Sequence, residues 1–97
     1  MIPISLSEQA SKEIKHIFET KNIPSNYALR VGVKGQSGCS GVNYVLGFDE
    51  KQENDQLFDV NGIQVVISKK DFMHLLGVKV DFLEDESVRG FVFKTDS

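Results

Sequence analysis

The chain has 97 residues and a mass of 10.9 kDa, the size of a single domain, which we expect to span residues 1–97. Eleven Lys and Arg against fourteen Asp and Glu give a net charge of −3 with both signs interspersed, which argues against a nucleic-acid partner. No apolar run approaches the roughly 20 residues of a membrane span, and no leader pattern opens the chain. A single cysteine excludes an internal disulfide and favours a reducing compartment, so we expect a cytoplasmic location.

The first half of the chain predicts a short strand, one helix and two longer strands. Ile2, Ile4 and Leu6 alternate with Pro3 and Ser5, which is typical of a short strand that Pro3 confines to an edge. Ser7 is a typical helix N-cap, and apolar residues then recur with helical spacing over about 14 residues: Ala10, Ile14, Ile17 and Phe18. The stretch 22–26 ends this helix, and alternating apolar residues predict strands at 29–33 and 42–48.

The second half predicts hairpins and one short helix. The polar run 49–56 is interpreted as an exposed loop. Asn61-Gly62 suits the positive φ angles of a type I′ turn and predicts a hairpin between residues 58–60 and 63–67.

A capping signal follows this hairpin. Ser68 with Asp71 three residues later resembles a capping box that begins a short helix, whose buried side is Phe72, Leu75 and Leu76 and whose stop is Gly77. Alternation at 78–82 and 91–93 predicts two final strands. The pattern is that of a β-rich α+β domain with mostly antiparallel or mixed strands, one longer N-terminal helix and one short helix.

The segment GQSGCSG, residues 35–41, holds the only cysteine between two predicted strands. Its glycines follow neither a dinucleotide-binding nor a P-loop pattern. Gly38 and Gly41 leave the sulfur of Cys39 free of bulk and allow backbone N–H groups to approach it, and Ser37 and Ser40 add hydroxyl donors. These donors favour a thiolate or a metal-bound sulfur. A buried, inert cysteine is the alternative, although such cysteines are more typical of apolar strands.

Other polar residues offer little chemistry. His16 and His74 fall on the polar sides of their predicted helices, and neither has a second ligand-type residue at a supporting spacing. The acidic run 84–86 is typical of a solvated turn, because acid–base catalysis needs carboxylates placed across a cleft. We therefore expect no enzyme activity.

Several stretches together resemble the HesB-like family of A-type iron–sulfur carriers, also called IscA-like: ISLSEQASKEI, LRVGV, GCSG, VNYVLGFDE and NGIQVVISKKDFMHLLGVKVDF with GFVFK. The resemblance runs from about Ile2 to Lys94, and its most specific element is the glycine-flanked Cys39. It implies a compact β-rich fold, assembly into homodimers or tetramers, and delivery of [2Fe-2S] or [4Fe-4S] clusters, or iron, between assembly proteins and recipient apo-proteins.

The chain departs from this family at its end. Family members carry a C-terminal Cys-Gly-Cys segment, and the resemblance implies that its two cysteines act as ligands with the loop cysteine. The sequence ends at Ser97 without them, either through natural loss or as a truncated form of a longer product, so Cys39 alone corresponds to a family ligand.

The number of ligands that an iron–sulfur cluster needs determines what else must take part in binding it. A cluster takes about four ligands, usually thiolates, and a dimer supplies two. We expect exogenous thiols such as glutathione, or a partner's cysteines, to supply the rest, with [2Fe-2S] preferred over [4Fe-4S] or iron alone. Two alternatives stay open: a HesB-like scaffold that binds partners without metal, and a redox-active thiol protein in which Cys39 has a low pKa.

Overall fold

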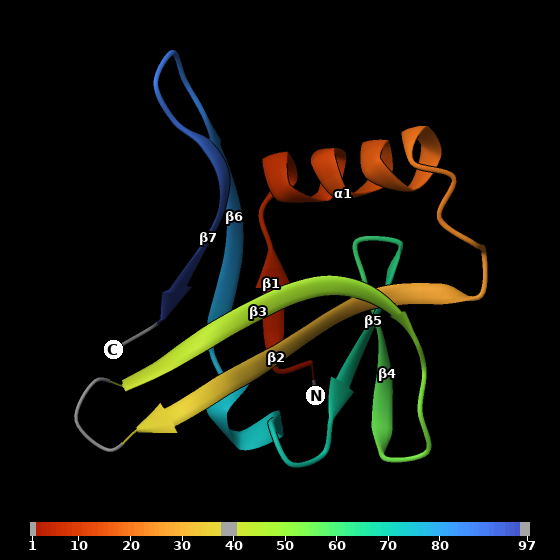
Figure 1. The fold of residues 1–97 in the computed structure, drawn as a ribbon, viewed down its shortest axis with the longest axis vertical. Helices are drawn as coiled ribbons and strands as arrows, with labels where there is room; N and C mark the ends of the chain where they lie inside the picture. Colours follow the sequence, from red (N-terminus) through yellow and green to blue (C-terminus); the bar gives the residue numbers. More distant parts are fainter. Residues whose placement is uncertain (1, 38–40, 96–97) are drawn as a thin grey trace.

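The computed structural model describes residues 2–37 and 41–95, which form seven strands, one α-helix and one 3₁₀-helix (Figure 1). The helices are α1 (Glu8–Thr20) and the 3₁₀-helix η1 (Phe72–Leu75). The strands are β1 (Ile4–Leu6), β2 (Tyr27–Ser37), β3 (Gly41–Glu50), β4 (Asp55–Val60), β5 (Ile63–Ser68), β6 (Val78–Glu84) and β7 (Arg89–Thr95). The predicted α+β class is confirmed.

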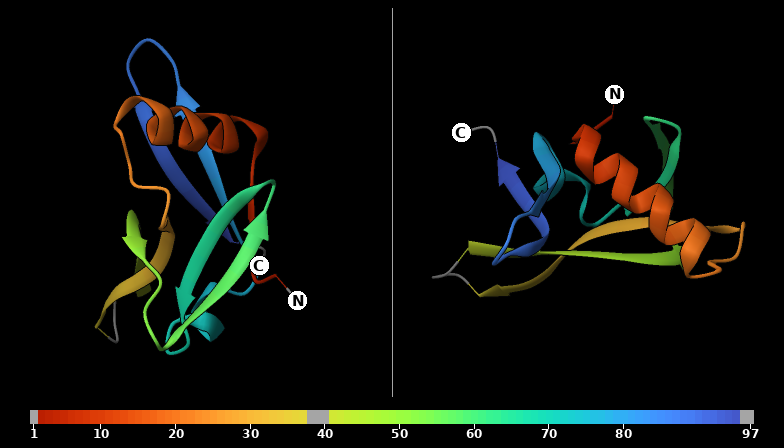
Figure 2. Two further views of the ribbon diagram at one scale, coloured as in Figure 1. Left: turned by 90° about the vertical axis from the view of Figure 1, so that its right-hand side faces the viewer. Right: turned by 90° about the horizontal axis from the view of Figure 1, so that it is seen from above.

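The strands form two mixed sheets, with orders β1-β6-β7 and β3-β2-β5-β4. Three antiparallel hairpins, β2–β3, β4–β5 and β6–β7, supply most of the pairing, and parallel pairs join β1 to β6 and β2 to β5. As Pro3 predicts, the strand that follows it lies at a sheet edge. Figure 2 shows the long β2–β3 hairpin crossing beneath α1 and projecting beyond the β6–β7 hairpin.

Helix α1 begins where the sequence predicts. The hydroxyl of Ser7 accepts a hydrogen bond from the backbone N–H of Ala10 at 3.0 Å and donates one to the Asp81 carboxylate of β6 at 2.6 Å. The same residue therefore caps the helix and ties its first turn to the neighbouring strand. Ala10 and Ile14 are fully buried and fix the side of the helix that faces the sheets.

One apolar core joins both sheets and α1. Its members are aliphatic and lie on the inward faces of the strands and the helix: Ile4, Leu6, Ala10, Ile14, Leu29, Val31, Val60, Ile63, Val65, Ile67, Leu75, Val78 and Val80. Because side chains alternate across a strand, the inward residues of β2 and β5 are spaced two apart, as predicted.

The capping signal at Ser68 is wrong. Ser68 is the last residue of β5 and does not cap η1; its carbonyl accepts the N–H of Asp71 at 2.9 Å. The Asp71 carboxylate turns instead towards β2, where it accepts the N–H of Val33 at 3.4 Å. The predicted helix is thus a single 3₁₀ turn, and Leu76 is 37% exposed rather than buried. Gly77, with φ of +82°, ends it as expected.

The interpretation of residues 49–56 as an exposed loop is also wrong at both ends. Strand β3 continues through Glu50 and β4 begins at Asp55, which leaves only 51–54 as the connection. Asp55 is just 6% exposed, because it is buried against an arginine of β2. Charge alone therefore did not distinguish a strand end from a loop.

The predicted turn between β4 and β5 is confirmed and has a second role. Asn61 and Gly62 adopt φ angles of +54° and +81°. The Asn61 side-chain amide donates to the carbonyl of Leu6 and to the hydroxyl of Ser11, both at 3.0 Å. The turn is thereby bonded to the end of β1 and the start of α1, which lie 55 and 50 residues earlier in the sequence.

We predict that Asn61→Asp lowers the free energy of unfolding by about 1–3 kcal/mol, because a carboxylate cannot donate to these two acceptors although it tolerates the same backbone conformation. Asn54→Asp, in the exposed 51–54 connection, is the control and changes stability by less than about 0.5 kcal/mol. Urea unfolding followed by circular dichroism measures both. Equal effects of the two substitutions would show that the Asn61 bonds contribute nothing.

Candidate functional site

The predicted cysteine loop is joined to the longest hairpin of the structure. Strands β2 and β3 have 11 and 10 residues and stay paired as far as Ser37 and Gly41. The sequence placed 35–41 in a loop, whereas the structure continues β2 through Ser37 and starts β3 at Gly41. The other three predicted site residues, Gly38, Cys39 and Ser40, lie outside the described residues.

A β-bulge lies close to the end of this hairpin. Lys34 pairs with Asn43 and Ser37 pairs with Gly41, so two residues of β2, 35 and 36, oppose one residue of β3. Such a bulge bends its strand, increases the local twist and changes the direction of the residues that follow. Glycine within a strand is a signal for a bulge, but the sequence analysis assigned Gly35 to the loop, so the bulge was not predicted.

Aromatic contacts hold the hairpin against the rest of the protein. The ring of Tyr44 stacks on that of Phe93 in β7, with centroids 5.2 Å apart, and Phe48 makes an edge contact with Phe18 of α1 at 4.9 Å. Both residues of β3 lie on the same face of the strand. The hairpin is thus fixed to α1 near one end and to β7 close to its cysteine-bearing end.

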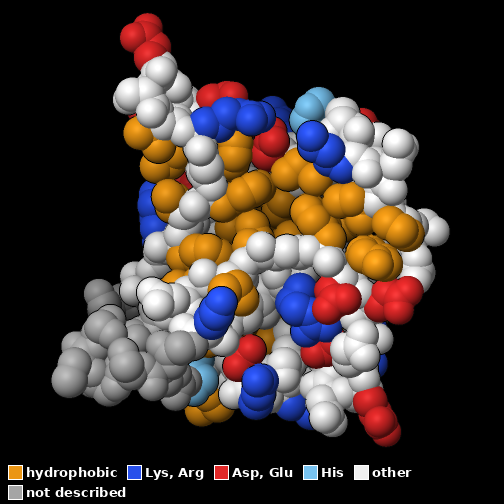
Figure 3. Space-filling model, viewed as in Figure 1, with side chains coloured by type: hydrophobic (Ala, Val, Ile, Leu, Met, Phe, Trp, Pro, Cys, Tyr) orange, Lys and Arg blue, Asp and Glu red, His pale blue; other side chains and the backbone are white. Residues whose placement is uncertain are grey.

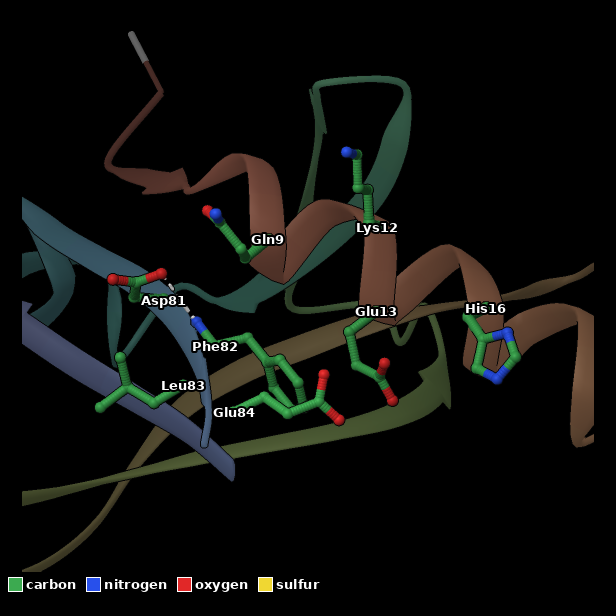
Figure 4. A pocket seen from close by; sticks show the side chains of 8 residues that line it. All are labelled: Gln9, Lys12, Glu13, His16, Asp81, Phe82, Leu83 and Glu84. Carbon is green, nitrogen blue, oxygen red and sulfur yellow. Dashed lines mark hydrogen bonds between the residues drawn. The ribbon is translucent and has the colours of Figure 1, made fainter. Parts of the chain in front are cut away.

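A groove of about 700 Å³ runs between α1 and β6 (Figure 4). In Figure 4 Glu13 projects from the helix towards Phe82 and Glu84. Arg89 donates to Glu13 at 3.2 Å and to Glu84 at 2.8 Å, and its guanidinium lies 5.4 Å from the Phe82 ring centroid. Arg89 is thus paired with two carboxylates of the same chain.

Neither histidine forms a ligand group. His16 is exposed and lines this groove, and His74 is exposed on η1. Over residues 2–37 and 41–95, no three His, Cys, Asp or Glu side chains come together as a metal site would require. In the acidic run, backbone N–H groups of Ser87 and Val88 bind the Asp85 carboxylate and lower its pKa, as in an ordinary turn.

A buried ion pair that the sequence did not predict supports the other end of the β2–β3 hairpin. The Arg30 guanidinium binds both oxygens of Asp55, one of them at 2.9 Å, and also donates to Asp49 at 3.0 Å. These hydrogen bonds, which Arg30 donates and Asp55 accepts, chiefly lower the pKa of the Asp55 carboxyl and chiefly raise the pKa of the Arg30 guanidinium. The pair joins β2, β3 and β4 and is structural, because its donors and acceptors are already used.

The fold and this hairpin have clear counterparts among known proteins. Residues 2–97 match the family described as iron–sulphur cluster biosynthesis. The iron-binding protein IscA of Enterobacter sp. strain 638 is 38% identical over 91 residues, covering 93% of this chain and 82% of that protein. The iron–sulfur cluster insertion protein ErpA of Hydrogenovibrio crunogenus is 33% identical over 93 residues, covering 95% and 80%. The crystal structure of Escherichia coli SufA, which is involved in the biosynthesis of iron–sulfur clusters, superposes with a TM-score of 0.74 at 25% identity, covering 95% of this chain and 84% of that one.

The β-rich fold, its cysteine-bearing hairpin and this family match together define the class: a protein of iron–sulfur cluster biosynthesis. The chain belongs to that family, the HesB-like A-type carriers that its sequence resembles. In the described part of the chain, no helix is both long enough and apolar enough to cross a membrane.

We predict that Asp55→Asn lowers the free energy of unfolding at pH 7 by about 1–3 kcal/mol, because Arg30 loses the buried one of its two carboxylate partners. The folded-state pKa of Asp55 is depressed, so its contribution is complete above the unfolded value of about 3.9 and is lost as the pH falls through the folded value. The stability difference between the native chain and the variant therefore narrows as the pH falls below about 4.

Urea titrations at pH 7 and pH 3 measure this difference. Glu8→Gln removes an exposed ion pair with Lys12, 3.5 Å long, and serves as a control with an effect under about 0.5 kcal/mol. A gap between native chain and Asp55→Asn that stays constant from pH 7 to pH 3 would contradict the assignment.

Proposed function

We propose that this chain, as a single HesB-like domain over residues 1–97, is a carrier that holds a labile iron–sulfur cluster or iron through Cys39 at a subunit interface and transfers it to apo-proteins. The observation that carries the proposal is the position of the only cysteine in the sequence. It falls between Ser37 and Gly41, the last paired residues of the projecting β2–β3 hairpin. A projecting hairpin can present a ligand to a second protein without any other part of the fold opening.

The local chemistry of residues 37–41 supports a bound thiolate. Gly38 and Gly41 have no side chain that could crowd the sulfur, and Ser37 and Ser40 each have a hydroxyl of the kind that can donate a hydrogen bond to it. Hydrogen bonds to a metal-bound sulfur are a principal means by which proteins adjust its charge. The bulge at residues 35–36 adds a means of directing the strand that leads to Cys39.

The number of ligands supports a shared and labile site. One thiolate per chain gives two in a dimer, and a [2Fe-2S] cluster requires about four ligands. We propose that glutathione or cysteines of a partner protein complete the set, and that the cluster is [2Fe-2S] rather than [4Fe-4S]. Ligands that leave easily suit transfer, because the acceptor's own cysteines can replace them one at a time.

The partners follow from this role. We propose that the chain forms a homodimer or tetramer in the cytoplasm, receives cluster or iron from assembly proteins and passes it to recipient apo-proteins. The iron–sulfur cluster insertion protein ErpA, 33% identical to this chain, is named for the delivery step. The cluster is cargo rather than a catalytic cofactor, so we propose no enzyme reaction for the chain.

Anaerobic reconstitution with iron, sulfide and glutathione tests the proposal. We predict a coloured species with about one iron and one sulfide per protomer for the native chain, because two chains share one [2Fe-2S] cluster. Cys39→Ser, which replaces a thiolate by a poor ligand for cluster iron, takes up none. Visible absorption and iron and sulfide analysis measure the uptake, and transfer is followed by the colour gained by an apo-ferredoxin.

Three results would contradict this proposal or favour one of the alternatives. Uptake that is absent in both chains contradicts the carrier proposal and favours a metal-free scaffold. Uptake that is equal in both chains shows that Cys39 is not a ligand. A Cys39 thiol that titrates well below the ordinary value of about 8.5 in a chain that binds no iron would favour a redox-active thiol.

A further inference from the structure

The half of the β2–β3 hairpin that leads to the cysteine segment has fewer strand partners than the other half. Strand β2 pairs with β5 only at Leu29 and Arg30, and β5 then continues to Ser68 beside β4. Beyond this point, within the described residues, β2 and β3 pair only with each other, over 31–37 and 41–46, which we call the arm. Two-stranded ribbons are marginally stable and strongly twisted, so the direction of the arm needs a further restraint.

The side chain of Asp71 reaches the open side of β2. Its carboxylate accepts the backbone N–H of Val33 at 3.4 Å, a long hydrogen bond made where β5 no longer pairs. The backbone of Asp71 is itself held, because its N–H donates to the carbonyl of Ser68 at 2.9 Å and its carbonyl accepts the N–H of His74 at 3.0 Å. Figure 1 shows η1 and the connection before it next to this part of β2. A fixed turn is thus bonded to the arm.

The absence of a side chain at Gly32 allows this carboxylate to lie close to the strand. A Cβ atom at Gly32 would lie 3.1 Å from Asp71 Oδ2 and 3.3 Å from Val45 Cγ2, both closer than ordinary van der Waals contact. Gly32 does not have a positive φ, so the need here is for space and not for an unusual backbone conformation. Asp71 therefore lies against two consecutive residues of the arm, 32 and 33.

The arm has a second attachment on its other strand. Tyr44 of β3 stacks on Phe93 of β7 with the ring centroids 5.2 Å apart. In Figure 3 apolar side chains gather above the hairpin, between it and α1, whereas charged side chains of both signs are exposed below it. An apolar contact is not directional, so the arm could still rotate about the stacked rings. The hydrogen bond from Val33 to Asp71, on the opposite strand, limits that rotation.

We propose that Asp71 is a positioning residue that sets the direction of the arm leading to Cys39. This inference rests on the proposed function, because the direction matters only if the thiolate must meet ligands from another molecule in a defined geometry. Val33 is well placed for this role, since it lies just before the bulge at residues 35–36 and four residues before Ser37, the last residue of β2. A rotation at Val33 is carried along the paired strands to the segment that holds the cysteine.

Two substitutions of Asp71 test the assignment in the metal-free chain. Alanine removes the acceptor, whereas asparagine keeps a side-chain oxygen at the same position. We expect amide hydrogen exchange at Val33 to become at least about tenfold faster in Asp71→Ala and to stay close to native in Asp71→Asn. Residual dipolar couplings of the N–H groups of 31–34 and 43–46 change in Asp71→Ala alone, and those of 27–30 stay constant.

Asp59→Ala is the matched control. The Asp59 carboxylate also accepts one backbone N–H, that of Gly62 at 3.0 Å, but it lies in the β4–β5 turn. Its loss removes the same kind of contact and leaves Val33 exchange and the couplings of the arm unchanged. Equal changes in Asp59→Ala and Asp71→Ala would overturn the proposal. So would native couplings of the arm in a folded Asp71→Ala chain.

Gly32→Ala provides a second variant in case Asp71→Ala does not fold. The added methyl group would lie 3.1 Å from Asp71 Oδ2 and displaces the carboxylate, so we expect faster exchange at Val33 and altered couplings of the arm. The native chain gives a test without any substitution, because the Val33 N–H owes its protection to Asp71. A native Val33 amide that exchanges as fast as an unstructured peptide would overturn the proposal.

Reconstituted chains separate this inference from the proposed function. In a native chain that takes up a cluster, Asp71→Ala changes the visible circular dichroism of the bound cluster at equal iron content, and Asp71→Asn restores it. An unchanged spectrum beside altered couplings of the arm would contradict the positioning role. If the native chain takes up no cluster but the couplings respond to Asp71→Ala, Asp71 still directs the arm and the proposed function fails.

Discussion

Burial of the inward face of the long β2–β3 hairpin is the constraint on which the rest of this structure depends. Leu29 and Val31 of β2 are completely buried, and α1, β5 and β6 all contribute side chains to the same core. At about 25 cal/mol per Å² of apolar surface, this shared burial outweighs any single polar contact in the protein. From this buried part the hairpin continues past the β6–β7 hairpin, as Figure 2 shows.

The elements that could be predicted from the sequence are those with a local cause. The Ser7 cap and the Asn61-Gly62 turn depend on residues within four positions of each other, and both are confirmed. The helix cap predicted at Ser68 is absent because the Asp71 carboxylate accepts a hydrogen bond from β2 instead. The burial of Asp55 could not be predicted from the polar run 49–56, because the arginine that pairs with it is 25 residues away. Bonds between residues far apart in the sequence produce no periodic pattern. Predictions from local patterns are therefore wrong where such bonds determine the structure.

The candidate site shows the same division. Its cysteine, glycines and serines are adjacent in sequence, so the sequence alone singles them out as a candidate site, whereas the bulge beside them appears only in the pairing of β2 with β3. The aromatic contacts of this hairpin could not be predicted either. Phe18 and Phe48, and Tyr44 and Phe93, come from elements far apart in sequence, each of which looks like an ordinary half-buried helix or strand when taken alone.

The bulge at residues 35–36 also sets how this hairpin can vary. The bulge allows β2 to be one residue longer than β3 between two paired positions while the pairing on either side is kept. Deleting residue 35 or 36 would leave one residue on each strand between the Lys34–Asn43 and Ser37–Gly41 pairs, and regular alternation would be restored there. This hairpin therefore contains a defined position at which its length can change by one residue without loss of its paired ladder.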